Sequence, residues 1–204
     1  MADLRSLMQA IAVGDAAACA RLLAAEPGLA RASIPDGATR ADPTANYLTA
    51  IAHYIYAGDT ALHIAAAAYR TELVERLIAL GADVRAKNRR GAEPLHYAAD
   101  GHPASAGWNP AAQAATIARL IAAGADPNAE SQGGVTPLHR AVRTRCAAAV
   151  AALLEGGADA QRPNAAGSTP LKLATQASGR GGSGSAEAKA QQAEIVALLE
   201  AAGA

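Results

Sequence analysis

The sequence predicts an all-α fold, a solenoid of stacked helix–turn–helix units with short hairpin fingers and a capping helix pair at the N-terminus. Two motifs recur along the chain, as expected for stacked repeats. The first repeats a leucine with spacings of 33, 43 and 33, at Leu62, Leu95, Leu138 and Leu171. The second repeats a glycine with spacings of 43, 33 and 46, at Gly81, Gly124, Gly157 and Gly203. The composition is 51% hydrophobic but only 3% aromatic, which favours thin, closely packed helices.

The leucine motif marks the start of the first helix in each unit. It reads TALH, EPLH, TPLH and TPLK, beginning at Thr60, Glu93, Thr136 and Thr169. Threonine is a favoured N-cap residue, and proline is favoured at the first helical position. An alanine three residues after the leucine, as in Leu62 and Ala65, lets neighbouring helices approach closely.

The glycine motif marks the end of the second helix. Residues 72–80 predict an amphipathic helix whose buried stripe is Leu73, Val74, Leu77 and Ile78. Gly81 then ends that helix, because glycine adopts the left-handed conformation found just beyond many helices. Residues 84–91 predict a finger that leads into the next unit.

Two interleaved motifs with a base period of 33 residues resemble the ankyrin repeat, whose motif is T-P-L-H-x-A. The resemblance is strong over residues 58–204 and weak before them. It implies a protein–protein interaction module or scaffold that is not an enzyme, needs no cofactor and binds through its concave face and fingers.

We expect one continuous domain that begins with a degenerate capping repeat at 1–33. Its predicted helices cover 4–13 and 16–25, with Leu22 and Leu23 facing inward. An atypical terminal repeat is usual, because one of its faces must meet water. The other predicted parts are an inserted segment at 34–57 and repeats at 58–90, 91–133, 134–166 and 167–204.

The inserted segment exceeds the regular period. Its run NYLTAIAHYIY predicts a short extra helix from Tyr47 to Tyr56. Two roles remain open for that helix. It either packs to close the stack or forms a wall of a binding groove, offering Tyr47, His53, Tyr54 and Tyr56.

The repeat at 91–133 has a leucine spacing of 43 instead of 33, with the additional residues inside 100–110. The only tryptophan, Trp108, lies there. Loops carry function more often than their share, and tryptophan is enriched at binding hot spots. Trp108 is therefore a candidate binding residue, and the alternative is that it folds back onto an outer helix.

The last repeat carries a glycine-rich insertion at 178–190. Its Gly179, Gly181 and Gly184 match the spacing GxGxxG. A dinucleotide site needs that motif after a β-strand, whereas a helix is expected before it here. We therefore interpret the insertion as a flexible Gly/Ser loop.

The histidines predict structure more than chemistry. His63, His96 and His139 hold the fourth motif position, where the resemblance implies that each ties its helix to a neighbouring loop. Stacked helices lie about 10 Å apart, too far for two such rings to share a metal at about 2 Å each. His102 neighbours Asp100, but no nucleophile motif accompanies that pair. No metal site and no catalytic residue are expected.

Charge and composition further narrow the classes of function that we expect for this protein. Eighteen basic and eighteen acidic residues cancel, so no general attraction to nucleic acid is expected. No apolar run is long enough for a membrane span, and the start lacks the pattern of a signal peptide. Two isolated cysteines, Cys19 and Cys146, fit a reduced cytoplasmic setting. Abundant alanine and arginine suggest a bacterial source, and we expect a monomer.

The resemblance also indicates which residues face a partner. Its finger and inner-helix positions, together with the inserted tryptophan, give Arg89, Arg90, Gln132, Val135, Arg143, Thr144 and Trp108. Three of these are arginines, which make bidentate contacts to carboxylates. We hypothesise a protein partner with an acidic patch; the alternative is a solvated charged edge. A second hypothesis is small-molecule binding or weak enzymatic activity in a pocket near Trp108 and His102, with Tyr54 as a further wall.

Overall fold

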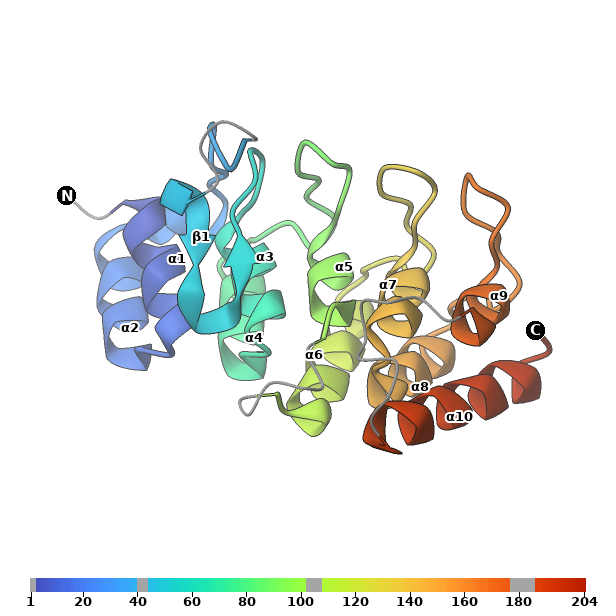
Figure 1. The fold of residues 1–204 in the computed structure, drawn as a ribbon. Helices are drawn as coiled ribbons and strands as arrows, with labels where there is room; N and C mark the ends of the chain where they lie inside the picture. The colour runs from blue at the N-terminus through green and yellow to red at the C-terminus, as the bar shows by residue number, and fades with distance from the viewer. Residues whose placement is uncertain (1–2, 40–43, 102–107, 177–185) are drawn as a thin grey trace.

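The computed structural model describes residues 3–39, 44–101, 108–176 and 186–204. Its helices stack in antiparallel pairs, with finger loops along one edge (Figure 1), which confirms the predicted all-α solenoid. The helices are α1 (Leu4–Val13), α2 (Ala16–Ala25), α3 (Ala61–Ala67), α4 (Thr71–Ala79), α5 (Pro94–Ala99), α6 (Pro110–Ala122), α7 (Pro137–Thr144), α8 (Ala147–Glu155), α9 (Pro170–Thr175) and α10 (Ala186–Ala201). One short 3-10 helix, η1 (Pro27–Ala30), follows α2.

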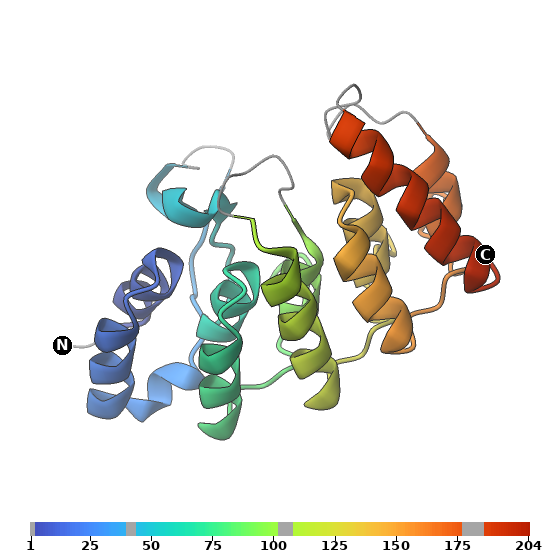
Figure 2. The ribbon, with the colours of Figure 1, turned by 90° about the horizontal axis from the view of Figure 1, so that it is seen from below.

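The helices form two layers. The inner layer consists of α1, α3, α5, α7 and α9, which lie next to the fingers, and the outer layer consists of α2, α4, α6, α8 and α10 (Figure 2). A single apolar core runs between the layers through every helix pair. Alanines such as Ala65, Ala98 and Ala141 are fully buried where inner helices meet. Their small side chains allow the close spacing of the stack.

The first helix pair has the bounds that the sequence predicts. The Asp3 and Asp15 carboxylates cap α1 and α2 by accepting hydrogen bonds from the N–H groups of Ser6 (2.9 Å) and Ala18 (2.8 Å). These bonds satisfy N–H groups that have no partner within the helix. Between the two helices, Gly14 adopts a φ of 78°, which a residue without Cβ tolerates best.

The motif residues begin the inner helices as predicted. Thr60, Thr136 and Thr169 stand in extended backbone immediately before α3, α7 and α9. The fingers are linked to one another by backbone hydrogen bonds, such as Gln132 N–H to the Arg90 carbonyl at 2.8 Å. Within the described fingers the only β-bridge joins Ser131 and Val135.

The predicted helix from Tyr47 to Tyr56 is wrong. That run instead forms a small hairpin, which we define as residues 44–54. Its elements are the 3-10 helix η2 (Thr44–Asn46), the strand β1 (Tyr47–Leu48), the 3-10 helix η3 (Thr49–Ile51) and the strand β2 (His53–Tyr54). The strands pair antiparallel, with Tyr47 opposite Tyr54 and Leu48 opposite His53.

Cross-strand packing explains this outcome. The rings of Tyr47 and Tyr54 lie 4.7 Å apart on the outer face, while Leu48 points inward and is buried. Aromatic pairs on one face stabilise a hairpin, and alternation between exposed and buried positions is the strand period. The backbone turns at Ala52, where φ is 50°.

Two features that stand out in the sequence fall outside the described residues. His102 and the three glycines of the GxGxxG spacing belong to residues 102–107 and 177–185. Among the described helices, none combines the length and the apolar character needed to cross a bilayer.

Candidate functional site

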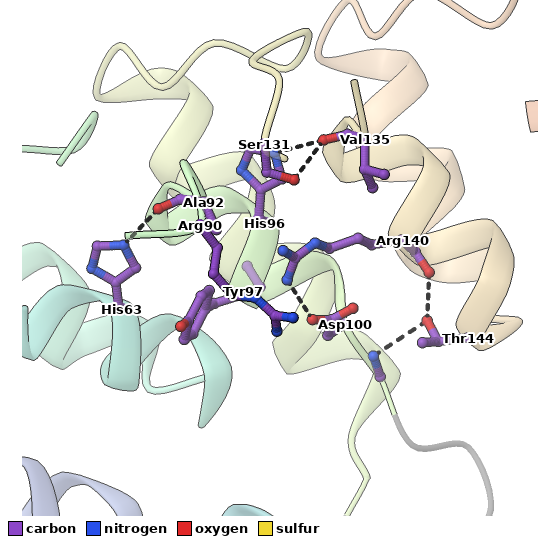
Figure 3. A network of polar contacts seen from close by, with 12 residues as sticks. His63, Arg90, Ala92, His96, Tyr97, Asp100, Ser131, Val135, Arg140 and Thr144 are labelled. Atoms are coloured by element: carbon purple, nitrogen blue, oxygen red, sulfur yellow. Dashed lines mark hydrogen bonds and ion pairs between the residues drawn. The ribbon is translucent and has the colours of Figure 1, made fainter. Parts of the chain in front are cut away.

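The motif histidines link each inner helix to the next finger. His63 accepts a hydrogen bond from the Thr60 N–H at Nδ1 (3.1 Å) and donates from Nε2 to the Ala92 carbonyl at 3.1 Å (Figure 3). His96 and His139 contact the carbonyls of Val135 and Ser168 in the same way, each at 3.1 Å. Because Nδ1 accepts, the proton sits on Nε2 and the rings are neutral. Burial lowers the pKa of all three, and that of His96 to about 3.

The hairpin covers the first part of the concave face. The His53 ring lies 4.4 Å from the Tyr97 ring of α5, centroid to centroid. At the other end, the Arg5 guanidinium of α1 donates to the Asn46 side chain at 2.7 Å and to the Asp36 carbonyl at 3.1 Å. The hairpin thus reaches from α1 to α5 across the inner layer, in front of α3 in Figure 1.

A buried polar cluster lies beneath the hairpin. The Asp59 carboxylate is completely buried and accepts hydrogen bonds from the Tyr97 hydroxyl (2.9 Å), the Asn88 amide (2.9 Å) and the Tyr56 N–H (2.7 Å). Burial and the neighbouring Asp59 charge raise the pKa of Tyr97. These bonds satisfy a buried charge and fix the positions of Tyr56 and Tyr97.

A cavity of about 100 Å³ opens between the hairpin, the finger at 84–91, α5 and α7. Arg90 enters it from the finger: its guanidinium carbon lies 4.8 Å from the centre of the Tyr56 ring, and its Nη1 donates to the Tyr56 hydroxyl at 3.2 Å. Arg140 enters it from α7 and pairs with Asp100 at 2.7 Å (Figure 3). The lining residues are His53, Tyr56, Asn88, Arg90, Ala92, Tyr97, Asp100 and Arg140.

Comparison with known families agrees with this architecture. A family model described as ankyrin repeats in three copies matches residues 7–108, and another described as ankyrin repeats in many copies matches residues 120–174. The chain belongs to the ankyrin-repeat family. No curated protein sequence matches it. Ankyrin repeats generally serve protein–protein interaction, and the family is typically non-enzymatic.

In this ankyrin-repeat chain, two of the three predicted arginines lie together. The Arg89 guanidinium donates to the Ala38 carbonyl and lies 5.4 Å from the Tyr56 ring, on which Arg90 also packs. Arg143 is exposed, one helical turn beyond Arg140 on α7, and does not line the cavity. The aromatic side chain of Tyr56 therefore holds Arg89 and Arg90 in place.

The other predicted partner-facing positions are Gln132, Val135 and Thr144, and they differ in how exposed they are. Gln132 is exposed at a finger. The Val135 carbonyl accepts from His96 and also from the Ser131 N–H at 2.9 Å, so its backbone belongs to the stacking contacts. The Thr144 hydroxyl donates to the Arg140 carbonyl at 2.9 Å and accepts from the Gly101 N–H at 3.3 Å.

Trp108 is half-buried against the core just before α6. Its indole N–H donates to the Gln113 side chain at 2.8 Å, and Gln113 in turn donates to the Ala98 carbonyl at 2.9 Å. The ring therefore packs back onto the repeat that carries it. Tyr54 lies elsewhere, exposed on the hairpin, and packs on Tyr47.

Sequence reasoning offered His53 and Tyr56, which both line the cavity, as parts of a groove wall, but it did not select Arg140 and Tyr97. Arg140 and Tyr97 each directly follow a motif histidine, at the position filled by Ile64 in α3 and Leu173 in α9. A change from aliphatic to polar or aromatic residues at this one position is the signal that could have identified them. In the described ranges, no group of three or more His, Cys, Asp or Glu side chains is arranged to hold a metal ion.

Proposed function

We propose that this ankyrin-repeat chain is a monomeric interaction module that binds a protein with an acidic patch. The proposed contact surface comprises the finger and inner-helix positions that the ankyrin resemblance indicates, together with the inserted tryptophan: Arg89, Arg90, Gln132, Val135, Arg143, Thr144 and Trp108. The repeat boundaries given above remain a prediction, and the proposal does not depend on them.

The observation that carries the proposal is the set of ordered arginines beside the hairpin. Arg89 and Arg90 are held on Tyr56, so less rotamer entropy is lost when they contact a partner. Arginine enrichment at interface hot spots and its bidentate geometry both favour carboxylate-bearing partners. Of the predicted polar side chains, Gln132 and Arg143 are the exposed ones that extend this surface along the stack.

A charge-reversal experiment tests the proposal. The wild-type chain is immobilised and used to capture proteins, and the same capture is repeated with Arg89→Glu plus Arg90→Glu. Arg21→Glu, an exposed change on the outer helix α2, is the matched control. We expect the double variant to lose the partner and the control to retain it. Equal capture by all three forms would overturn the assignment of this face.

We further propose a reducing, cytoplasmic setting and a bacterial source. Cys19 and Cys146 are both free and buried in α2 and just before α8. Burial raises the pKa of the Cys146 thiol to about 11, which keeps it protonated and unreactive.

A further inference from the structure

We infer that the cavity between Arg90 and Arg140 is a recognition site for a single carboxylate group of the protein partner. This inference rests on the proposed function and gives the chemistry of one subsite within the proposed face. The carboxylate comes from an aspartate or glutamate side chain or from the end of a chain.

The first support is the arrangement of cations. Each guanidinium group carries five N–H donors. Arg90 donates one hydrogen bond to Tyr56, and Arg140 donates one to Asp100. Figure 3 shows both guanidinium groups near Asp100, with a contact drawn from Arg140. The cavity lining thus holds two guanidinium groups and one carboxylate, Asp100, and a second carboxylate balances the charge. The Asp100 contact and the Tyr56 ring hold both guanidinium groups in place before a ligand arrives.

The second support is an unsatisfied ring nitrogen. His53 lines the cavity, and its Nε2 is buried without a hydrogen-bond partner among the described residues. Leaving a buried polar atom unpaired costs about 1–3 kcal/mol. Burial lowers the pKa of His53, so the ring is neutral at pH 7. With its proton on Nε2, the neutral ring has one N–H donor without a partner among the described residues, in a side chain that lines the cavity.

Size selects the ligand. The cavity is small, with a volume of about 100 Å³. Pockets for small-molecule ligands span about 300–1,000 Å³. The cavity therefore accepts the end of a side chain or of a chain, and a whole metabolite does not fit. Asp100 in the lining also disfavours a phosphate group, which carries nearly two negative charges at pH 7.

The inference is tested by NMR titration of the full chain with three blocked peptides at constant ionic strength. Acetyl-Gly-Glu-Gly-amide offers a side-chain carboxylate, acetyl-Gly-Gly-Gly offers a chain-end carboxylate, and acetyl-Gly-Gln-Gly-amide offers none. The resonances followed are the Nε–H groups of Arg90 and Arg140 and the ring nitrogens of His53. We expect saturable shifts at all three residues with at least one carboxylate peptide, and none with the glutamine peptide.

Variants make the result specific to the cavity. Arg90→Gln removes one cation from an exposed side chain, and we expect at least a tenfold loss of affinity for the carboxylate peptide. Arg90→Lys keeps the charge but loses the planar group on Tyr56, and an intermediate loss is expected. Arg21→Gln is the matched control, because this arginine is exposed on the outer helix α2, away from the cavity and from the proposed contact surface.

Three outcomes would overturn the inference: no saturable shift with either carboxylate peptide, equal losses for Arg90→Gln and Arg21→Gln, or tighter binding of a phosphoserine peptide than of the glutamate peptide. Saturation by only one carboxylate peptide supports the site and identifies the source of the group. Failure here is distinct from failure of the proposed function. If the site is absent but the face is correct, charge reversal at Arg89 and Arg90 still abolishes partner capture.

Discussion

The two ends of the solenoid use the same repeat differently. Around α3 and α5, the hairpin, the Asp59 cluster and the finger arginines cover the inner layer with aromatic and charged contacts. Around α7 and α9, the fingers turn at Gly134 and Gly167 without aromatic side chains. The candidate site therefore combines an addition to the repeat, the hairpin segment, with repeat positions whose residue type differs from that in the other units.

One position shows the difference most directly. The residue after the fourth motif position is Ile64, Tyr97, Arg140 and Leu173 in successive inner helices. It is aliphatic at both ends and aromatic or charged in the middle. Tyr97 and Arg140 line the cavity, whereas Ile64 is completely buried in the core. The same position of the repeat therefore serves core packing in one unit and lines the cavity in two others.

The largest expected effect is a loss of folding stability in acid, and it concerns the repeats that carry a motif histidine. Burial lowers the folded-state pKa of His63, His96 and His139, while the unfolded chain takes up protons near pH 6.5. The neutral histidines contribute their full stability above pH 6.5, and this contribution is lost as the pH falls below 6.5. For His96, with a pKa of about 3, the loss at pH 5 is about 2 kcal/mol.

Urea unfolding at pH 7 and pH 5 measures this loss. The last repeat has Lys172 in place of the histidine, so hydrogen exchange in α9 and α10 should respond least to acid. A free energy of unfolding that is unchanged between pH 7 and pH 5 would contradict the assignment of neutral buried rings.

The next effect concerns the buried cluster that only the N-terminal half contains. Tyr97→Phe removes one of the donors to the buried Asp59 carboxylate. We expect a loss of about 1–3 kcal/mol in the free energy of unfolding, because a buried acceptor is left short of a partner. Tyr47→Phe, on the exposed face of the hairpin, is the control and should change stability little. Equal effects in chemical denaturation would show that the cluster adds nothing to stability.

A smaller change in stability, this time a gain, is expected from replacing Glu93. This residue stands in place of the motif threonine before α5. Its side chain is fully buried, both carboxylate oxygens are without a hydrogen bond among the described residues, and Lys87 Nζ lies 3.7 Å away. Burial raises the pKa of Glu93, so the charged form destabilises the fold above that pKa.

Glu93→Thr should therefore stabilise the chain at pH 7 by about 1 kcal/mol, the typical contribution of an N-cap hydroxyl. The gain relative to wild type should shrink as the pH falls and Glu93 becomes protonated. Thermal unfolding at pH 7 and pH 4.5 follows both values. Destabilisation at pH 7 would mean that the contact with Lys87 outweighs the cost of burial.

The smallest effect is local to the hairpin. Tyr54→Ser removes the ring that packs on Tyr47 at 4.7 Å. Such cross-strand pairs contribute about 0.2–1 kcal/mol. Amide exchange should rise within residues 47–54, while the solenoid keeps its unfolding midpoint. If the midpoint of the whole chain falls steeply, the hairpin is an integral part of the repeat stack.

The sequence was informative where local chemistry decides structure. Asp3, Gly14 and Asp15 mark the bounds of α1 and α2, and the motif threonines mark the starts of inner helices, because caps act over a few residues. It failed at Tyr47 to Tyr56, where a short apolar run fits either helix or strand and cross-strand contacts decide.

The candidate site was only partly predictable for a related reason. Arg89 and Arg90 could be placed on a finger from the repeat register alone. The cavity requires Arg140, Asp100 and His53 as well, which come together through packing between the hairpin, α5 and α7. The change of residue type at Tyr97 and Arg140 is visible in the sequence, but contacts between residues so distant in sequence cannot be derived from it.

We propose that the partner binds beside the hairpin, at the finger formed by residues 84–91 and at the inner helices α5 and α7. Hydrogen–deuterium exchange of the chain, with and without the captured partner, tests it most directly. We expect slower amide exchange in the hairpin and in residues 84–91 when the partner is bound, with exchange in the outer helices unchanged. Protection confined to α8 and α10, with the hairpin and that finger unaffected, would contradict it.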